Sequence, residues 1–252
     1  MEPRVSVGTW RWGTCRPHAG SVAGGVGPAL WVCVRERGPL TIVCMSHPID
    51  DPTADLPPIQ VGEIWENPVS GERARLLEPP WHNSEGRLVA ELAALVGARV
   101  AGEHRHPNTV ERFTAVDGEL TVRLNGETSI LREGQTREVE PGRWHDWWNA
   151  SDVEALVRVE VTPGERFMHM IETLWGLARL GHTNDKGMPN LLQLAMFGRE
   201  FSDVIQFRNP PPLVQKAMFG VLGVVGRPLG YRGTYRQLSR TASAVRPVGQ
   251  QS

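Results

Sequence analysis

Three histidines and one glutamate, set at short and uneven intervals, constrain the fold of this chain more than any other feature of its sequence. His104 and His106 are separated by one residue, Glu111 follows five positions later, and His145 comes 34 positions after Glu111. Side chains at i and i+2 of an extended strand point to one face, so both imidazoles share a side. Glu111 can return to that side on the next strand, and His145 can join from a later hairpin. Nitrogen and oxygen donors of this kind suit a first-row transition metal with positions left open for water or substrate.

Glycines and a proline stand at fixed distances from these four residues. The first group runs from Gly97 through the ligands to Gly118, and the second from Gly134 through Pro141-Gly142 and His145 to Asn149, with fifteen residues between the groups. Over roughly residues 86–163 the chain resembles the two signature motifs of the cupin superfamily. Gly97 lies one residue further from His104 than is usual, and Glu140 stands where a proline is common, but neither is a ligand position.

The resemblance implies a mainly β fold, the cupin double-stranded β-helix or jelly-roll barrel, over residues 59–164. It also implies that His104, His106, Glu111 and His145 bind a divalent transition metal. Iron, manganese, nickel, copper and zinc all remain open, because imidazole suits each of them. The other reading is a barrel that keeps these residues for hydrogen bonding only.

The residue pattern by itself predicts about ten short strands. Apolar residues alternate with polar ones, as in Val157, Val159 and Val161, and Asn125-Gly126 predicts a tight hairpin turn. Further strands are expected over residues 59–65, 74–77 and 88–95. Short strands punctuated by Gly and Pro are typical of a jelly roll or small barrel, whose interior can hold one small ligand.

Three further side chains are candidates for a substrate pocket: Phe113, Trp147 and Asn149. By strand parity, Trp147 and Asn149 share the inward face with His145, whereas Trp144 and Trp148 face away. Tryptophan beside a metal can form the wall of a pocket and exclude water, although it is often plain core filler.

The hydrophobic period changes from two to 3.6 after residue 164, which predicts a helical extension over residues 165–230. Three helices are expected, at 167–178, from Pro189 to about Ile205, and at 214–225. They can cover the outside of the barrel or an open sheet edge, or they can form a homodimer contact. They can also close the barrel mouth, with Gln193 or His169 reaching substrate, or bind a membrane through helix 214–225. Cover and dimer rank first. The membrane ranks last and is not expected as a partner, because helix 214–225 lacks the basic polar face that such helices usually carry.

The ends of the chain differ from its middle. All three cysteines lie in residues 1–44, where no periodicity is visible, and Met45 follows at once. We therefore predict that translation starts at Met45 and that residues 1–44 are a non-native segment; a disordered or targeting extension is the alternative. Residues 45–58 are expected to be a flexible leader and residues 231–252 a disordered tail.

Composition excludes some classes of function. The net charge is −1 with 22% charged residues, and Arg and Lys cluster only mildly near the C-terminus, so no nucleic-acid partner is expected. No apolar run reaches the eighteen or so residues that span a bilayer. A cytoplasmic location is expected.

Two classes of function remain. The first is a metal-dependent oxygenase-type enzyme, or an isomerase, acting on a small molecule, with Glu111 able to accept a substrate proton as a catalytic residue. The second is a non-enzymatic protein whose barrel binds a small ligand.

Overall fold

The computed structural model describes residues 32–34, 41–43, 59–100, 102–235 and 238. The chain divides into two compact units, Met1–Ser46 and His47–Ser252. In the first unit, β1 (Val32–Val34) and β2 (Thr41–Val43) pair as antiparallel strands. The predicted start at Met45, the leader 45–58 and most of the predicted tail 231–252 lie outside the described residues; of the tail, residues 231–235 and 238 are described.

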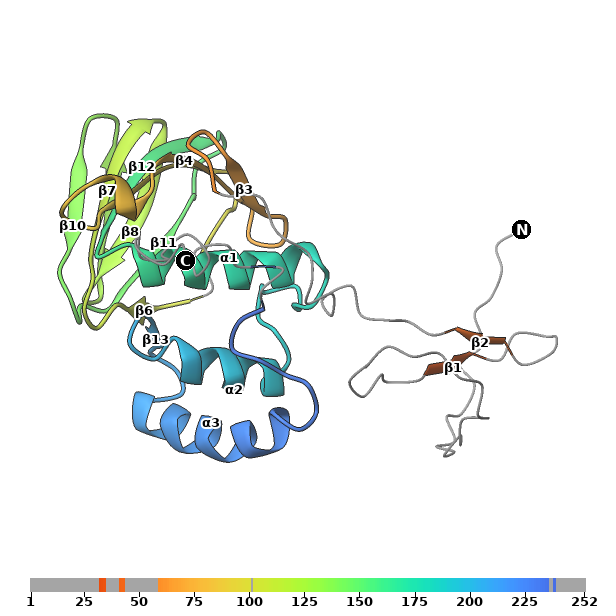
Figure 1. Cartoon of the computed structure of the whole chain (residues 1–252). Helices are drawn as coiled ribbons and strands as arrows, with labels where there is room; N and C mark the ends of the chain where they lie inside the picture. Colours follow the sequence, from red (N-terminus) through yellow and green to blue (C-terminus); the bar gives the residue numbers. More distant parts are fainter. Residues whose placement is uncertain (1–31, 35–40, 44–58, 101, 236–237, 239–252) are drawn as a thin grey trace, which may run out of the picture. The chain divides into compact units, whose positions relative to one another are not determined.

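Two antiparallel sheets make up the barrel of the second unit (Figure 1). The six-stranded sheet has the order β10-β7-β12-β5-β4-β3, and the five-stranded sheet has the order β13-β6-β11-β8-β9. The strands of the first sheet are β3 (Ile64–Asn67), β4 (Glu72–Glu78), β5 (Leu88–Ala94), β7 (Val110–Asp117), β10 (Thr136–Val139) and β12 (Ala155–Thr162). Those of the second are β6 (His104–Arg105), β8 (Glu119–Leu124), β9 (Glu127–Arg132), β11 (His145–Trp148) and β13 (Gln206–Phe207). A short 3-10 helix, η1 (Pro80–His82), joins β4 to β5.

The predicted alternation fills the barrel interior. Val157, Val159 and Val161 are buried on β12, and Leu120 and Val122 are buried on β8. The hairpin between β8 and β9 turns at Asn125 (φ 51°) and Gly126 (φ 91°), the left-handed pair that a two-residue turn needs. The mainly β fold predicted from the sequence is confirmed.

The first barrel strand is shorter than predicted. The expected strand over 59–65 begins only at Ile64, because the chain turns at Gly62 (φ 87°), whose N–H donates to the Leu76 carbonyl. A positive φ of this size interrupts an extended strand.

Three helices follow the barrel, α1 (Glu165–Arg179), α2 (Leu191–Glu200) and α3 (Pro212–Gly226). Met168 and Trp175 of α1 belong to the same buried cluster as the barrel interior, so α1 covers the barrel. Asn190 caps α2, since its side-chain oxygen accepts hydrogen bonds from the N–H groups of Leu192 and Gln193.

The second helix does not continue to Ile205 as predicted. It ends at Glu200, and after a turn the chain forms β13, which pairs with β6 of the barrel. The physical reason is a second buried cluster, in which Phe201, Val204 and Ile205 pack with Met170 and Phe197 and anchor the turn. No helix in the described part of the chain is long and apolar enough to cross a bilayer.

Candidate metal centre

The two sheets bring the four predicted ligands together. His104 lies on β6 and His145 lies opposite it on the paired strand β11. His106 follows β6 directly, and Glu111 comes from β7 in the other sheet. All four side chains are buried, and each offers a ligand atom within 4.8 Å of the others.

Backbone carbonyls orient all three imidazole rings. The Nδ1 atoms of His104, His106 and His145 lie 2.9, 2.7 and 3.1 Å from the carbonyl oxygens of Gly102, Val204 and Arg143, respectively. A carbonyl only accepts, so each Nδ1 carries the hydrogen. In a neutral ring the Nε2 lone pair is then available to a metal, which is the usual arrangement around a metal-binding histidine. His145, whose Nε2 donates to Glu111 Oε2 at 3.0 Å, would release that proton on metal binding.

The single carboxylate of the cluster lies against two of the rings. Glu111 Oε2 is 3.0 Å from His145 Nε2 and 3.4 Å from His106 Nε2. Burial alone would raise the pKa of Glu111, but the proximity and positive charge of these two rings outweigh it and lower the pKa. Burial alone would likewise lower the pKa of His145, but the hydrogen bond and charge of Glu111 raise it. Burial, together with the other two rings, lowers the pKa of His104.

One nitrogen in the cluster has no hydrogen-bond partner. His106 Nε2 is fully buried and makes no hydrogen bond within the described structure. A buried polar atom without a partner costs free energy, and a cation held between the three Nε2 atoms and Glu111 would remove that cost. The donor set of three imidazoles and one carboxylate therefore fits a divalent transition metal.

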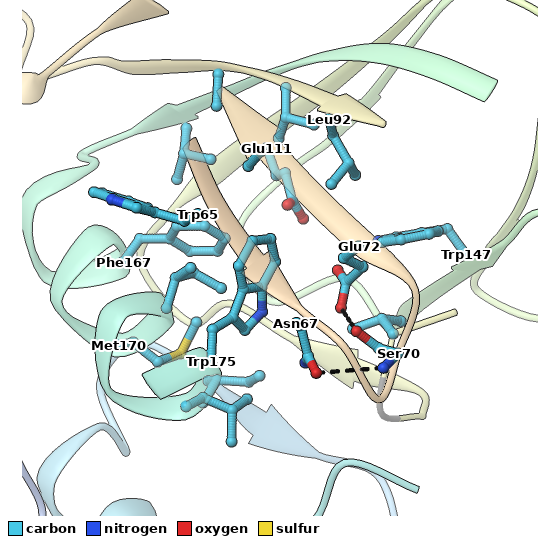
Figure 2. A pocket seen from close by; sticks show the side chains of 18 of the residues that line it. Trp65, Asn67, Ser70, Glu72, Leu92, Glu111, Trp147, Phe167, Met170 and Trp175 are labelled. Atoms are coloured by element: carbon cyan, nitrogen blue, oxygen red, sulfur yellow. Dashed lines mark hydrogen bonds between the residues drawn. The ribbon is translucent and has the colours of Figure 1, made fainter. Parts of the chain in front are cut away.

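A cavity with a mostly apolar wall adjoins this cluster (Figure 2). His104, His106 and Glu111 lie in its wall, as do Phe113 and Trp147, two of the three predicted pocket residues. Helix α1 closes one side with a set of large side chains: Phe167, Met170, Ile171, Leu174 and Trp175. Helix α1 therefore covers the cavity.

The third predicted pocket residue has a different place. Asn149 is buried but does not line the cavity, because its amide nitrogen donates to the carbonyls of Ala94 (2.9 Å) and Val153 (2.7 Å). It holds the loop after β11. His169 and Gln193 do not line the cavity either: the first packs on Phe201, and the second bonds to the Arg232 carbonyl and the Tyr235 hydroxyl.

Sequence reasoning missed a second carboxylate in the cavity wall. Glu72 on β4 is buried, lines the cavity and accepts a hydrogen bond from the Ser70 hydroxyl; Figure 2 shows both beside Asn67. Burial raises its pKa from 4.5 to about 7, against the opposing effect of the Ser70 bond and with the help of the negative charge of Glu111. Strand parity could have identified it, since Glu72 has the same parity as the inward residues Ala74 and Leu76 and therefore shares their face of β4.

Residues 92–162 match the model of the family described as "Cupin domain". The barrel is a cupin domain. The predicted family is thereby confirmed. The sequence of the whole chain has no match among curated proteins.

Solved structures with a similar fold are distant in sequence. KdgF from Halomonas sp. is 18% identical, with 42% of this chain and 90% of that chain covered and a TM-score of 0.36. TT1209 from Thermus thermophilus is 28% identical, with 35% and 83% covered and a TM-score of 0.31. A sugar phosphate isomerase of the cupin superfamily from Silicibacter pomeroyi is 19% identical, with 41% and 69% covered and a TM-score of 0.35. Similarity of this degree assigns no activity to the present cupin.

Proposed function

We propose that this cupin is a metal-dependent, oxygenase-type enzyme that acts on a small and largely apolar molecule. The observation that carries the proposal is the convergence of three histidines and the Glu111 carboxylate beside a mostly apolar cavity, which His104, His106 and Glu111 line. Four protein donors leave coordination positions free on a metal that takes five or six ligands.

Each residue of the cluster has a distinct task in this proposal. The carbonyls of Gly102, Val204 and Arg143 hold the rings with Nε2 inward, so that the rings are already oriented for a metal. Glu111 supplies the negative charge that partly neutralises a divalent cation, and it can accept a substrate proton if it leaves the metal. A bound iron, manganese, nickel, copper or zinc ion would supply redox or Lewis-acid chemistry.

The wall of the cavity sets the class of substrate. Aromatic side chains stand in the wall among a larger number of aliphatic ones; they include Trp65, Phe113, Phe167 and Trp175. Such a wall binds a flat or aliphatic body and excludes water from the reacting end, where electrostatic interactions become stronger. An enol, diketone or thiol group at that end would reach the metal.

A metal-dependent isomerase is the second candidate, and Glu72 favours it. A buried carboxyl whose pKa is raised to about 7 exchanges a proton near neutral pH, as a general acid or base in an isomerisation must. Glu72 faces the same cavity as the metal cluster. A barrel that binds a ligand without turnover is the remaining alternative.

Metal analysis of the purified chain tests the proposal first. We expect near-stoichiometric transition metal in the wild type, and none in a His104→Ala, His106→Ala double variant. His82→Ala, which removes an exposed histidine far from the cluster in sequence, is the matched control and should keep its metal. No metal in the wild type, even after reconstitution, would remove the enzyme mechanism.

Oxygen consumption then separates the candidates. An oxygenase should take up O₂ with an enol, diketone or thiol substrate. An isomerase should instead exchange a substrate proton with deuterated solvent and use no O₂. If a ligand raises the thermal midpoint but neither reaction occurs, the barrel is a binding protein. The homodimer and the cytoplasmic location expected from the sequence stay predictions.

A further inference from the structure

One face of α3 is apolar and points away from the rest of the described chain. The opposite face packs on α2 through Phe219, which lies against Gly198. The outward side chains are large and exposed, with Leu213 at 82% and Val224 at 72% of their full accessibility. The others on this side are Val214, Val221 and Val225, and Leu229 follows just beyond the helix. Soluble proteins seldom leave an apolar surface of this kind in water unless something binds it.

The charge of the chain is divided sharply between its two parts. Residues 204–252 contain seven Arg and Lys residues and no Asp or Glu, whereas residues 1–203 contain 20 basic and 28 acidic residues. The near-neutral net charge of the whole chain therefore conceals a cationic C-terminal segment that includes α3. A segment with this charge attracts an anionic partner.

Two basic residues, one within α3 and one at its C-terminal cap, lie beside the apolar face of the helix and not within it. Lys216 and Arg227 are eleven positions apart, about three helical turns, so they lie on the same flank. Both are exposed. Arg232 follows the helix and donates to the backbone carbonyls of Arg227 and Tyr231. These hydrogen bonds do not neutralise its positive charge, because a carbonyl carries no net charge.

We propose that the outward face of α3 is a docking surface for an anionic lipid bilayer. The apolar side chains would lie at the boundary between headgroups and acyl chains, and Lys216, Arg227 and Arg232 would contact lipid phosphates. The sequence alone ranked a membrane last because helix 214–225 lacked a basic polar face. The structure places cations along one flank and beyond the end of the helix, which serves the same purpose. A helix of 15 residues is too short to cross a bilayer, so it lies in the interface.

Charge also argues for lipid over a second copy of the chain. A two-fold contact through α3 would bring two cationic segments together, whereas a lipid surface of opposite charge is attracted to each. The proposal does not depend on the metal centre, because none of the α3 residues lines the cavity.

Co-sedimentation of the full chain with vesicles tests this surface. We expect binding to vesicles of phosphatidylcholine mixed with phosphatidylglycerol, and much weaker binding to phosphatidylcholine alone. Lys216→Ala together with Arg227→Ala should weaken binding about thirtyfold, at about 1 kcal/mol per basic residue. Val221→Glu together with Val224→Glu should abolish it. Val153→Glu, at a position 54% exposed outside α3, is the matched control and should bind like the wild type.

Light scattering on the same proteins identifies the rival occupant. A wild-type dimer that Val221→Glu and Val224→Glu dissociate, with no vesicle binding by the wild type, would overturn the proposal and assign the face to a second copy. Equal binding to both kinds of vesicle would overturn the role of the cations. Far-UV circular dichroism and a thermal midpoint like those of the wild type in every α3 variant would show that a loss of vesicle binding is not a loss of folding.

Discussion

Replacement of Glu72 by glutamine should stabilise the fold at neutral and alkaline pH. The pKa of Glu72 rises from 4.5 to about 7 on folding, chiefly because the carboxyl is buried in the cavity wall. Between these two pH values the native state keeps a proton that the unfolded state has lost. The free energy of unfolding of the wild type should therefore fall as the pH rises through this window.

The size of the effect follows from the shift of the pKa. One pKa unit corresponds to about 1.4 kcal/mol, so a shift of about 2.5 units costs the wild type about 3 kcal/mol above pH 7. Glutamine cannot ionise, and its side-chain oxygen can still accept the hydrogen bond from Ser70. The variant and the wild type should have similar stability near pH 4.5 and should diverge by up to about 3 kcal/mol near pH 8.

Urea unfolding at several pH values, followed by tryptophan fluorescence and done with a chelator to exclude metal, measures this difference. Glu127→Gln, at an exposed position of β9, is the control and should follow the wild type. Parallel curves for Glu72→Gln and the wild type would show that Glu72 ionises at an ordinary pKa. The proton-transfer role that favours an isomerase would then be wrong.

Three other perturbations test the cavity, the metal and the extension. Phe113→Ala, which empties a fully buried site in the barrel, should lower the free energy of unfolding by about 3–5 kcal/mol in denaturant titration, whereas a loss below about 1 kcal/mol would contradict its packing. A chelator should lower the thermal midpoint, because metal at about a hundred times its dissociation constant adds about 2.7 kcal/mol; an unchanged midpoint would mean that no metal was bound. Asn190→Ala removes the N-cap of α2 and should cost about 1 kcal/mol, most of which Asn190→Ser should restore.

The sequence predicted the parts of the fold that depend on local periodicity. Val157, Val159 and Val161 alternate with polar residues, and β12 buries all three valines. Asn125-Gly126 permits few conformations other than a tight turn, and the hairpin forms there. The four ligand positions were predictable because their spacing matched a family motif, and the structure brings them within 4.8 Å of one another.

Features set by contacts between distant segments were not predictable in this way. Residues 201–205 continue a helical pattern, yet tertiary packing of Phe201 and Ile205 ends the helix early. Strand parity correctly predicted that Asn149 is buried. It could not show that the side-chain amide donates to the backbone carbonyls of Ala94 and Val153 instead of lining the cavity. Glu72 is the opposite case. Strand parity placed it on the same face as Ala74 and Leu76, but a single acidic residue in a short strand did not by itself indicate a functional site.

The segment from Val204 to Phe207 joins the helical extension to the metal centre. Its first carbonyl accepts the hydrogen bond from His106 Nδ1, and its strand β13 pairs with β6, which carries His104. Ile205 and Phe207 also line the cavity. A cupin barrel that ended at residue 164 would leave His106 Nδ1 without this acceptor, β6 without a partner on that side, and the cavity without α1. The extension is therefore part of the site, because the orientation of one ligand depends on a residue 98 positions further along the chain.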